Sequence, residues 1–448
     1  MKLSVITFCL SVIMTLSVSA RSLEGDWHGT LAIGPSSLRI AFKIQPSDAT
    51  PVTMDSPDQG ASGLPGKITY ISTDSVSLEF PMLKASYQGT LIDGKLKGTF
   101  FQGGYSLPLE MLPGRFDVIR SQTPQPPFPY VEEEVKVVNP DVEGVTLAGT
   151  LTIPDGASSM TPIVVFVSGS GLQNRDEELF GHKPFAVVAD FLARAGIASF
   201  RYDDRGFGES TGDYRTAVTA DFASDAAAAI KAMRKMGRFG KTGVLGHSEG
   251  AQIAFMLASD GKTCPDFIVG MGTPSMRGDS VLVGQTEAAL RQGGLPKEMT
   301  ESHILALRSV YQSLVSGDMA KAREVAAAQV KLSSDNPPLR ALAESLTKII
   351  ETSNPWLRTF YSYSPENDIK TVGCPAFAIY GSLDSQVLPE NYERIRQINP
   401  GIEAKLYPGL NHMMQHATTG SVQEYNAIEE TISPEVLKDI EDFIKKQY

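Results

Sequence analysis

Short runs in which apolar and polar residues alternate fill the N-terminal part of the chain. The clearest of them cover residues 27–33, 38–45, 75–80, 87–92 and 95–101. Alternation with a period of two is typical of half-buried β-strands, and Asp93-Gly94 and Gly103-Gly104 favour hairpin turns between strands. We therefore predict an all-β domain over residues 21–112, with roughly eight strands in a barrel-like, up-and-down arrangement.

A proline-rich stretch follows at residues 113–130, with prolines at positions 124, 126, 127 and 129. Proline restricts the backbone to extended conformations, and this stretch shows no useful periodicity of apolar residues. It is therefore predicted to be a linker between two domains.

The pattern changes again from residue 131 onward. Residues 132–138 and 145–153 predict an antiparallel pair of strands, after which apolar runs alternate with helix-like segments. The apolar runs cover residues 163–167, 197–202, 242–245, 267–271, 376–380 and 403–407. Runs without alternation are typical of strands that helices cover on both faces. Residues 131–448 are therefore predicted to form an α/β domain around a mostly parallel, eight-stranded sheet flanked by helices.

About a hundred residues, roughly 273–372, interrupt this domain between two of the expected strands. Apolar residues recur at helical spacing in segments 301–314, 319–332 and 338–350. We expect a helical insertion here. A last helix is predicted after Ser433, the expected N-cap, with Pro434 at its first position and one apolar face against the sheet.

The first twenty residues have the features of a secretory signal peptide. Lys2 precedes an apolar run at residues 3–16, and Val18-Ser19-Ala20 resembles a cleavage site. A lipoprotein signal at Cys9 is the less favoured alternative, because apolar sequence continues beyond it. We expect an exported protein, periplasmic or extracellular, that begins at Arg21 and has no stable membrane insertion after cleavage.

Charge and cysteine content narrow the classes of partner. Loss of Lys2 with the signal changes the formal charge from −11 to −12, which disfavours nucleic acid and anionic lipid and favours a small neutral substrate. Only Cys264 and Cys374 would remain, too few for a disulfide-dense scaffold or the usual zinc site. Two buried free thiols are favoured over a disulfide between them, and no cofactor is expected.

The strongest chemical signal is Gly246-His247-Ser248-Glu249-Gly250, between the expected strand at 242–245 and a helix-like segment at 251–259. This G-x-S-x-G pattern between strand and helix is typical of a nucleophile elbow, which presents a serine hydroxyl at the edge of a sheet. Ser248 is therefore the predicted nucleophile.

A serine nucleophile needs a base and an acid that orients the base. His412 follows the expected strand at 403–407, and Asp384 follows the strand at 376–380, so both should lie at the sheet edge that carries Ser248. The order nucleophile, acid, base along the chain, here Ser248, Asp384 and His412, is the order found in folds with a G-x-S-x-G elbow. His416 is a less favoured alternative to His412. The other histidines, His28, His182, His247 and His303, lie in segments that do not suit the role.

The oxyanion of the reaction needs two backbone donors. We assign these to the N–H groups of Glu249, which directly follows the nucleophile, and Ser170, in the small-residue segment 168–171 after a strand; Gly171 and Leu172 are alternatives to Ser170. The charged loop 203–210 is interpreted as structural rather than metal-binding, because it lacks further ligands at defined spacing.

These motifs together resemble the α/β-hydrolase superfamily, in particular EstD-type carboxylesterases and serine aminopeptidase-like hydrolases. The resemblance covers residues 131–448 and rests on segments 168–171, 202–210, 246–250, 381–384 and 409–412. It implies an α/β-hydrolase fold in which Ser248 is the nucleophile, His412 the base and then acid, and Asp384 the orienting acid. It also implies that the insertion is a cap over the site. Candidate pocket walls in that cap are Trp356, Leu357, Phe360, Tyr361 and Tyr363.

The predicted function is hydrolysis of a small-molecule carboxylic ester through an acyl-enzyme. A serine aminopeptidase or amidase is the nearest alternative, since one fold hosts several chemistries. A protein that binds a ligand or glycan through its β domain, with a vestigial hydrolase domain, is the alternative from another class.

Overall fold

The computed structural model describes residues 23–33, 36–48, 50–56, 61–114, 120–333, 337–352 and 354–448. The predicted signal peptide at 1–20 lies outside these residues, as does part of the predicted linker. The chain divides into two compact units, Met1–Asp117 and Val118–Tyr448.

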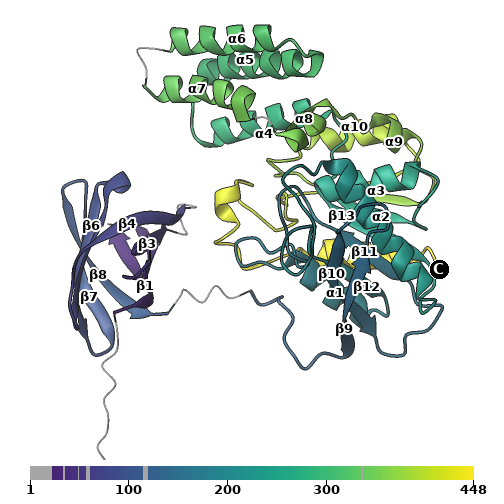
Figure 1. The fold of residues 1–448 in the computed structure, drawn as a ribbon, viewed down its shortest axis with the longest axis horizontal. Helices are drawn as coiled ribbons and strands as arrows, with labels where there is room; N and C mark the ends of the chain where they lie inside the picture. Colours follow the sequence, from purple (N-terminus) through teal and green to yellow (C-terminus); the bar gives the residue numbers. More distant parts are fainter. Residues whose placement is uncertain are drawn as a thin grey trace, which may run out of the picture. The chain divides into compact units, whose positions relative to one another are not determined.

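The first unit is a closed β-barrel (Figure 1). Its strands are β1 (Gly25–Ile33), β2 (Ser36–Ile44), β3 (Val52–Ser56), β4 (Ala61–Ile71), β5 (Ser75–Phe80), β6 (Ala85–Ile92), β7 (Lys95–Gln102) and β8 (Tyr105–Pro113), with a 3-10 turn, η2 (Pro81–Leu83), before β6. Each strand pairs antiparallel with the next, and β8 closes on β1. The predicted up-and-down barrel is confirmed.

Large apolar side chains fill the interior of this barrel. Phe42 lies 5.4 Å from Phe80 and 5.1 Å from Tyr87 between ring centroids, and all three are buried. The alternation pattern did not locate β3, β4 and β8. In β4 the reason is visible, because Gly63, Pro65 and a register shift between Ile68 and Tyr70 interrupt the pattern.

The second unit is built on an eight-stranded sheet in the order β16-β15-β14-β13-β11-β12-β10-β9. Its strands are β9 (Tyr130–Val138), β10 (Thr146–Pro154), β11 (Ile163–Val167), β12 (Ala198–Tyr202), β13 (Thr242–His247), β14 (Ile268–Met271), β15 (Ala376–Gly381) and β16 (Glu403–Tyr407). β9 and β10 pair antiparallel, as do β10 and β12, and every other pair is parallel. This mostly parallel sheet confirms the expected α/β-hydrolase fold.

Helices cover both faces of the sheet. They are α1 (Pro184–Arg194), α2 (Thr219–Lys235), α3 (Glu249–Ser259), α10 (Glu390–Ile398) and α11 (Pro434–Lys445). Phe185 of α1 and Phe443 of α11 belong to one apolar core, and Ile230 of α2 and Ile253 of α3 belong to the other. Burial on both faces explains why the central strands are apolar without alternation. Ser433 stands at the expected N-cap of α11, but its side chain makes no capping hydrogen bond.

The predicted helical insertion lies between β14 and β15 and is drawn in green in Figure 1. Its helices are α4 (Gly278–Gln292), α5 (Lys297–Ser316), α6 (Met319–Leu332), α7 (Pro337–Thr352), α8 (Pro355–Ser362) and α9 (Glu366–Lys370). Leu307, Val310 and Leu346 are part of an apolar core that α5, α6 and α7 share. We call residues 273–372 the cap.

Part of the stretch predicted as a linker is held against the second unit. Arg120 donates to the carbonyl oxygens of Ile428, Asn426 and Phe180, the last two at 2.9 Å. Gln122 bonds in both directions with the backbone of Ile432, through its Nε2 at 2.7 Å and its Oε1 at 3.1 Å. These hydrogen bonds fix Arg120 and Gln122 to the second unit, which a linker between domains does not require.

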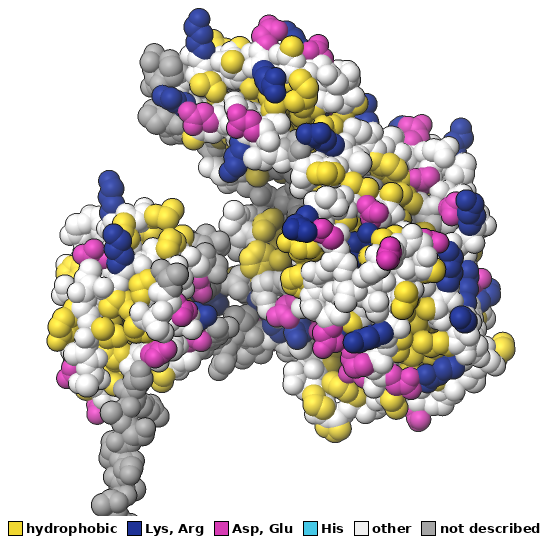
Figure 2. All heavy atoms as spheres, viewed as in Figure 1, with side chains coloured by type: hydrophobic (Ala, Val, Ile, Leu, Met, Phe, Trp, Pro, Cys, Tyr) yellow, Lys and Arg dark blue, Asp and Glu magenta, His cyan; other side chains and the backbone are white. Residues whose placement is uncertain are grey.

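Cys264 and Cys374 are free, partly buried thiols and do not form a disulfide. Burial, with Cys264 alongside, raises the pKa of Cys374 well above its usual range. No helix in the described part of the chain is long and apolar enough to cross a bilayer. Acidic and basic side chains are interspersed over the face shown in Figure 2, so the net negative charge does not gather into a single patch there.

Candidate active site

Ser248 lies at the sharp turn from β13 into α3, with a left-handed φ of 54°. Its N–H donates to the Met271 carbonyl at 2.8 Å, which ties the turn to β14. A Cβ on Gly246 would overlap the carbonyl of Gly250, and a Cβ on Gly250 would overlap the carbonyl of Val167. Both glycines therefore let strand and helix approach closely, as the predicted nucleophile turn requires.

His412 and Asp384 meet at the same edge of the sheet. His412 Nδ1 lies 2.8 Å from Asp384 Oδ2, and both side chains are almost fully buried. The other carboxylate oxygen, Oδ1, accepts the backbone N–H groups of Gln386 and Val387 at 2.8 Å each. A carboxylate beside Nδ1 favours the tautomer in which Nδ1 donates the hydrogen bond and Nε2 of His412 is left as an acceptor.

His416, the alternative base, is placed differently. Its side chain is 64% exposed and pairs with Glu430 at 2.8 Å. It is absent from the residues that line the cavity described next, whereas His412 lines it. The structure therefore brings His412, and not His416, together with Asp384.

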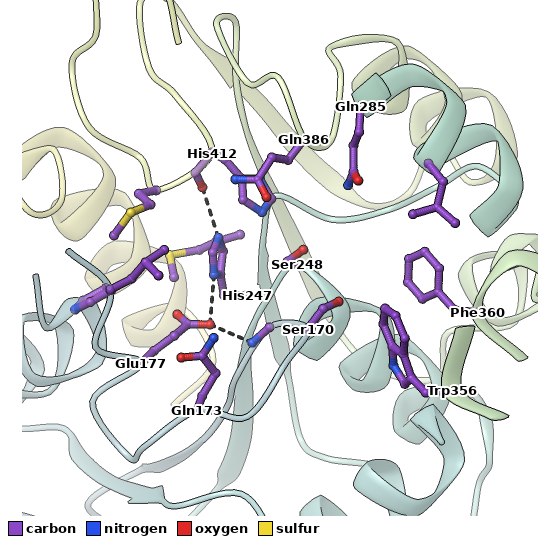
Figure 3. A pocket seen from close by; sticks show the side chains of 16 residues that line it. Ser170, Gln173, Glu177, His247, Ser248, Gln285, Trp356, Phe360, Gln386 and His412 are labelled. Atoms are coloured by element: carbon purple, nitrogen blue, oxygen red, sulfur yellow. Dashed lines mark hydrogen bonds and ion pairs between the residues drawn. The ribbon is translucent and has the colours of Figure 1, made fainter. Parts of the chain in front are cut away.

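Ser248 and His412 line one cavity of about 190 Å³ (Figure 3). Ser170 of the loop after β11 lines it, and the cap contributes further walls. The cap residues in the lining are Leu282, Gln285, Trp356 and Phe360. A cavity enclosed by core and cap is a suitable place for a small substrate.

The aromatic residues proposed as pocket walls divide into two groups. Trp356 and Phe360 stack with ring centroids 5.1 Å apart, and both line the cavity. Tyr361 and Leu357 pack in the cap core instead. Tyr363 is not in the lining, and its hydroxyl bonds to Asp368 within the cap.

The two predicted oxyanion donors are available. Glu249 is the first residue of α3, directly after Ser248, and Ser170 lies on the cavity wall. Within the described residues, neither backbone N–H donates to another protein group. Unpaired backbone N–H groups are the donors that a developing anion needs, and that of Glu249 is also at the start of a helix.

A buried carboxylate supports the loop that carries Ser170. Asp204 accepts from the Ser168 hydroxyl at 2.7 Å and from the Gln173 N–H at 2.8 Å. Burial, together with the nearby negative charges of Glu177 and Glu249, raises the pKa of Asp204 to about 7 despite these bonds. Through these bonds, the loop 203–210 holds the loop of Ser170 in place. The described residues contain no group of three or more side chains suited to hold a metal ion.

A second carboxylate–histidine pair, Glu177 with His247, lies beside Asp384 and His412 and was not predicted from the sequence. Glu177 Oε1 accepts from the Gly169 N–H at 2.6 Å and contacts His247 Nδ1 at 3.0 Å, while His247 Nε2 lies 3.1 Å from the carbonyl oxygen of His412 (Figure 3). Burial opposes the charged form of His247, but the charge and hydrogen bond of Glu177 outweigh it, so the pKa of His247 is raised. The pair links the loop of Ser170 to the loop of His412. His247 was visible in the motif, but no pattern marked Glu177.

A direct hydrogen bond joins the cap to Glu249, the residue that follows Ser248. Trp356 Nε1 donates to Glu249 Oε1 at 2.8 Å, and the Thr219 hydroxyl donates to the same oxygen at 2.6 Å. Burial raises the pKa of Glu249, while the hydrogen bonds from Thr219, Trp356 and Ser170 oppose that rise. One side chain of the cap is thereby connected to the residue that follows Ser248.

The chain is similar in sequence to known hydrolases. The family described as serine aminopeptidase, S33, matches residues 182–418. Esterase EstD from Thermotoga maritima is 29% identical over 210 residues, which are 47% of this chain and 46% of that protein. The chain thus matches about half the length of this relative.

Among solved structures, the Pyrococcus furiosus esterase Pf2001 is similar over 71% of this chain and 91% of its own, with 20% identity and a TM-score of 0.43. The proline iminopeptidase of Mycobacterium smegmatis is similar over 70% of this chain and 98% of its own, with 16% identity and a TM-score of 0.44. The family match spans more than half of the chain and includes the Ser248 turn, Asp384 and His412. The chain belongs to the serine aminopeptidase S33 family of α/β hydrolases.

Proposed function

We propose that this protein is a serine hydrolase that cleaves small-molecule carboxylic esters. The observation that carries the proposal is the buried Asp384–His412 pair beside a cavity that also contains Ser248. Its similarity to an esterase over half of that relative's length supports the choice of ester substrates. Export to the periplasm or the exterior is also proposed, on the signal-like residues 1–20.

In the proposed mechanism, Ser248 Oγ attacks the ester carbonyl while His412 Nε2 takes its proton. The N–H groups of Ser170 and Glu249 stabilise the negative oxygen of the tetrahedral intermediate, a contribution of about 10²–10³ in rate per donor. His412 then donates the proton to the leaving alcohol, and an acyl-enzyme remains on Ser248. A water molecule activated by His412 releases the acid and restores the enzyme, while Asp384 keeps the imidazole oriented throughout.

One observation favours a second candidate function, an aminopeptidase. Glu177 lines the cavity, and its Oε2 is buried without a hydrogen-bond partner among the described residues. A substrate ammonium group could occupy this position, since a buried carboxylate oxygen needs a donor. The family name points to the same chemistry. The ester proposal is preferred because Glu177 Oε1 is already bonded to Gly169 and His247.

The test compares hydrolysis of p-nitrophenyl acetate and butyrate with hydrolysis of aminoacyl p-nitroanilides. Ser248→Ala and His412→Ala are each expected to lower ester turnover by at least about 10³-fold, because both belong to one catalytic unit. His416→Ala is the matched control for His412 and should retain activity, since its side chain is 64% exposed and outside the cavity.

Turnover of esters that Ser248→Ala abolishes would support the proposal. Turnover of nitroanilides alone would replace it with the aminopeptidase. If neither class of substrate reacts, the chain is not an active hydrolase, and ligand binding by the β-barrel becomes the function to test.

A further inference from the structure

A second cavity, of about 410 Å³, adjoins the one that contains Ser248 and His412. Its lining consists of Gln285, Ala289, Gln292, Gly293, Ser385, Gln386, Val422 and Gln423. Gln285 of α4 and Gln386 of the loop after β15 line both cavities, so they form the wall between them. This side cavity is within the range of about 300–1,000 Å³ that small-molecule sites usually have.

The chemistry of the side cavity is polar and uncharged. Four of its lining residues are glutamines, and none is acidic, basic or histidine. Gln386 donates through Nε2 to the Tyr425 hydroxyl at 3.0 Å, which leaves its Oε1 without a protein partner among the described residues. The side chain of Gln285 makes no hydrogen bond to the described protein groups. The amide atoms that lack a protein partner can pair with hydroxyl groups of a ligand, whereas a charged ligand would find no counter-charge here.

The position of His412 decides which half of an ester reaches these amides. In the proposed mechanism His412 gives its proton to the leaving oxygen, so the alcohol must lie on the side of His412. Gln386 lies beside His412 in Figure 3, and Gln285 lies beyond Gln386 on the cap side. Trp356 and Phe360 lie instead on the side of Ser170 and form an apolar wall suited to the acyl chain.

From this arrangement we infer that the side cavity is the subsite for the alcohol, and that the preferred substrates are esters of neutral, hydroxyl-rich alcohols such as sugars. The inference rests on the proposed esterase function. The hydroxyl groups of the alcohol pair with Gln285 and Gln386, and the acyl chain lies against Trp356 and Phe360. Hydrolysis releases the intact alcohol and a carboxylic acid, with water as the only other reactant.

The test measures kcat/KM for an acetylated methyl glycoside and for a cycloalkyl acetate of similar size that has no hydroxyl groups. The acetyl group is the same in both, so the ratio of the two values reports recognition of the alcohol. The ratio is expected to exceed about 10 in the native enzyme. Gln285→Leu and Gln386→Leu should each lower it about 3- to 10-fold, the usual effect of losing one neutral hydrogen bond. Gln329→Leu, on α6 and outside both cavities, should leave it unchanged.

Two results would overturn the inference without touching the proposed function. One is a ratio at or below one while p-nitrophenyl acetate is hydrolysed. The other is an equal fall in both kcat/KM values in the two glutamine variants, which indicates a structural effect. Failure of the native enzyme to hydrolyse any ester, p-nitrophenyl acetate included, would instead overturn the proposed function itself.

Discussion

Replacement of Ser248 by glycine should stabilise the second unit while it abolishes activity. Ser248 has φ 54° and ψ −115°, a conformation that residues with a Cβ rarely adopt. Strain of this kind costs about 1–3 kcal/mol. Glycine removes the strain, but its greater freedom in the unfolded chain costs about 0.5–1 kcal/mol. Ser248→Gly should therefore be more stable than Ser248→Ala, which keeps the Cβ, by about 1 kcal/mol.

The assay is urea unfolding followed by circular dichroism at the helical band. The α-helices of the described residues all lie in the second unit, so this signal reports its unfolding. Ser362, at the end of α8, provides a control of opposite sign. It is exposed and helical, so Ser362→Gly should be less stable than Ser362→Ala by up to about 1 kcal/mol. If Ser248→Gly were also less stable than Ser248→Ala, the reasoning from strain would be refuted.

His247, His182 and the bond from Trp356 to Glu249 can each be tested by a substitution. Glu177→Gln should lower the stability of the protein more at about pH 5.5 than at about pH 9. Glu177 raises the pKa of His247, so its stabilising effect is complete at low pH and is lost as the pH rises through that pKa. Equal shifts of the urea midpoint at the two pH values would contradict this prediction. Burial lowers the pKa of His182 from its usual value of about 6.5 to about 4. The free energy of unfolding of the native protein should therefore fall by about 3 kcal/mol as the pH is lowered from about 6.5 to about 4. In His182→Gln that loss should be absent from the pH profile of unfolding free energy, and parallel profiles would exclude the assignment. Trp356→Phe removes the donor to Glu249 Oε1 and should lower kcat/KM for p-nitrophenyl butyrate about 10-fold, whereas an unchanged value would show that the bond does not support catalysis.

The fold was predictable where burial is uniform. β11 is buried at all five positions, and such strands appear in the sequence as unbroken apolar runs. The helix α4 was not among the predicted helical segments, because its inward face is not a continuous apolar stripe. It carries Gln285 and Leu282 toward the cavity, and among its buried residues are Gly278 and Asp279. A helix that borders a polar cavity lacks the periodicity on which such predictions depend.

The candidate site was predictable where sheet topology alone brings residues together. Asp384 and His412 follow neighbouring parallel strands, so their meeting required only the order of the strands. Glu177 is different, because a long loop between β11 and α1 folds back to place its carboxylate against His247 and Gly169. No local pattern encodes such a contact, which depends on the path of an irregular loop through three dimensions.

The cap has a consequence for how substrate preference can change over evolutionary time. Its helices form one continuous insertion, while Ser248, Asp384, His412 and the two proposed backbone donors all belong to the core of the second unit. Exchange of the insertion could therefore alter the walls of the cavity and leave the proposed reacting groups in place. The bond from Trp356 to Glu249 limits that freedom. A transplanted cap without an indole at this position would leave a buried carboxylate with one donor fewer, directly beside Ser248. Successful chimeras should therefore keep the tryptophan or replace Glu249 as well.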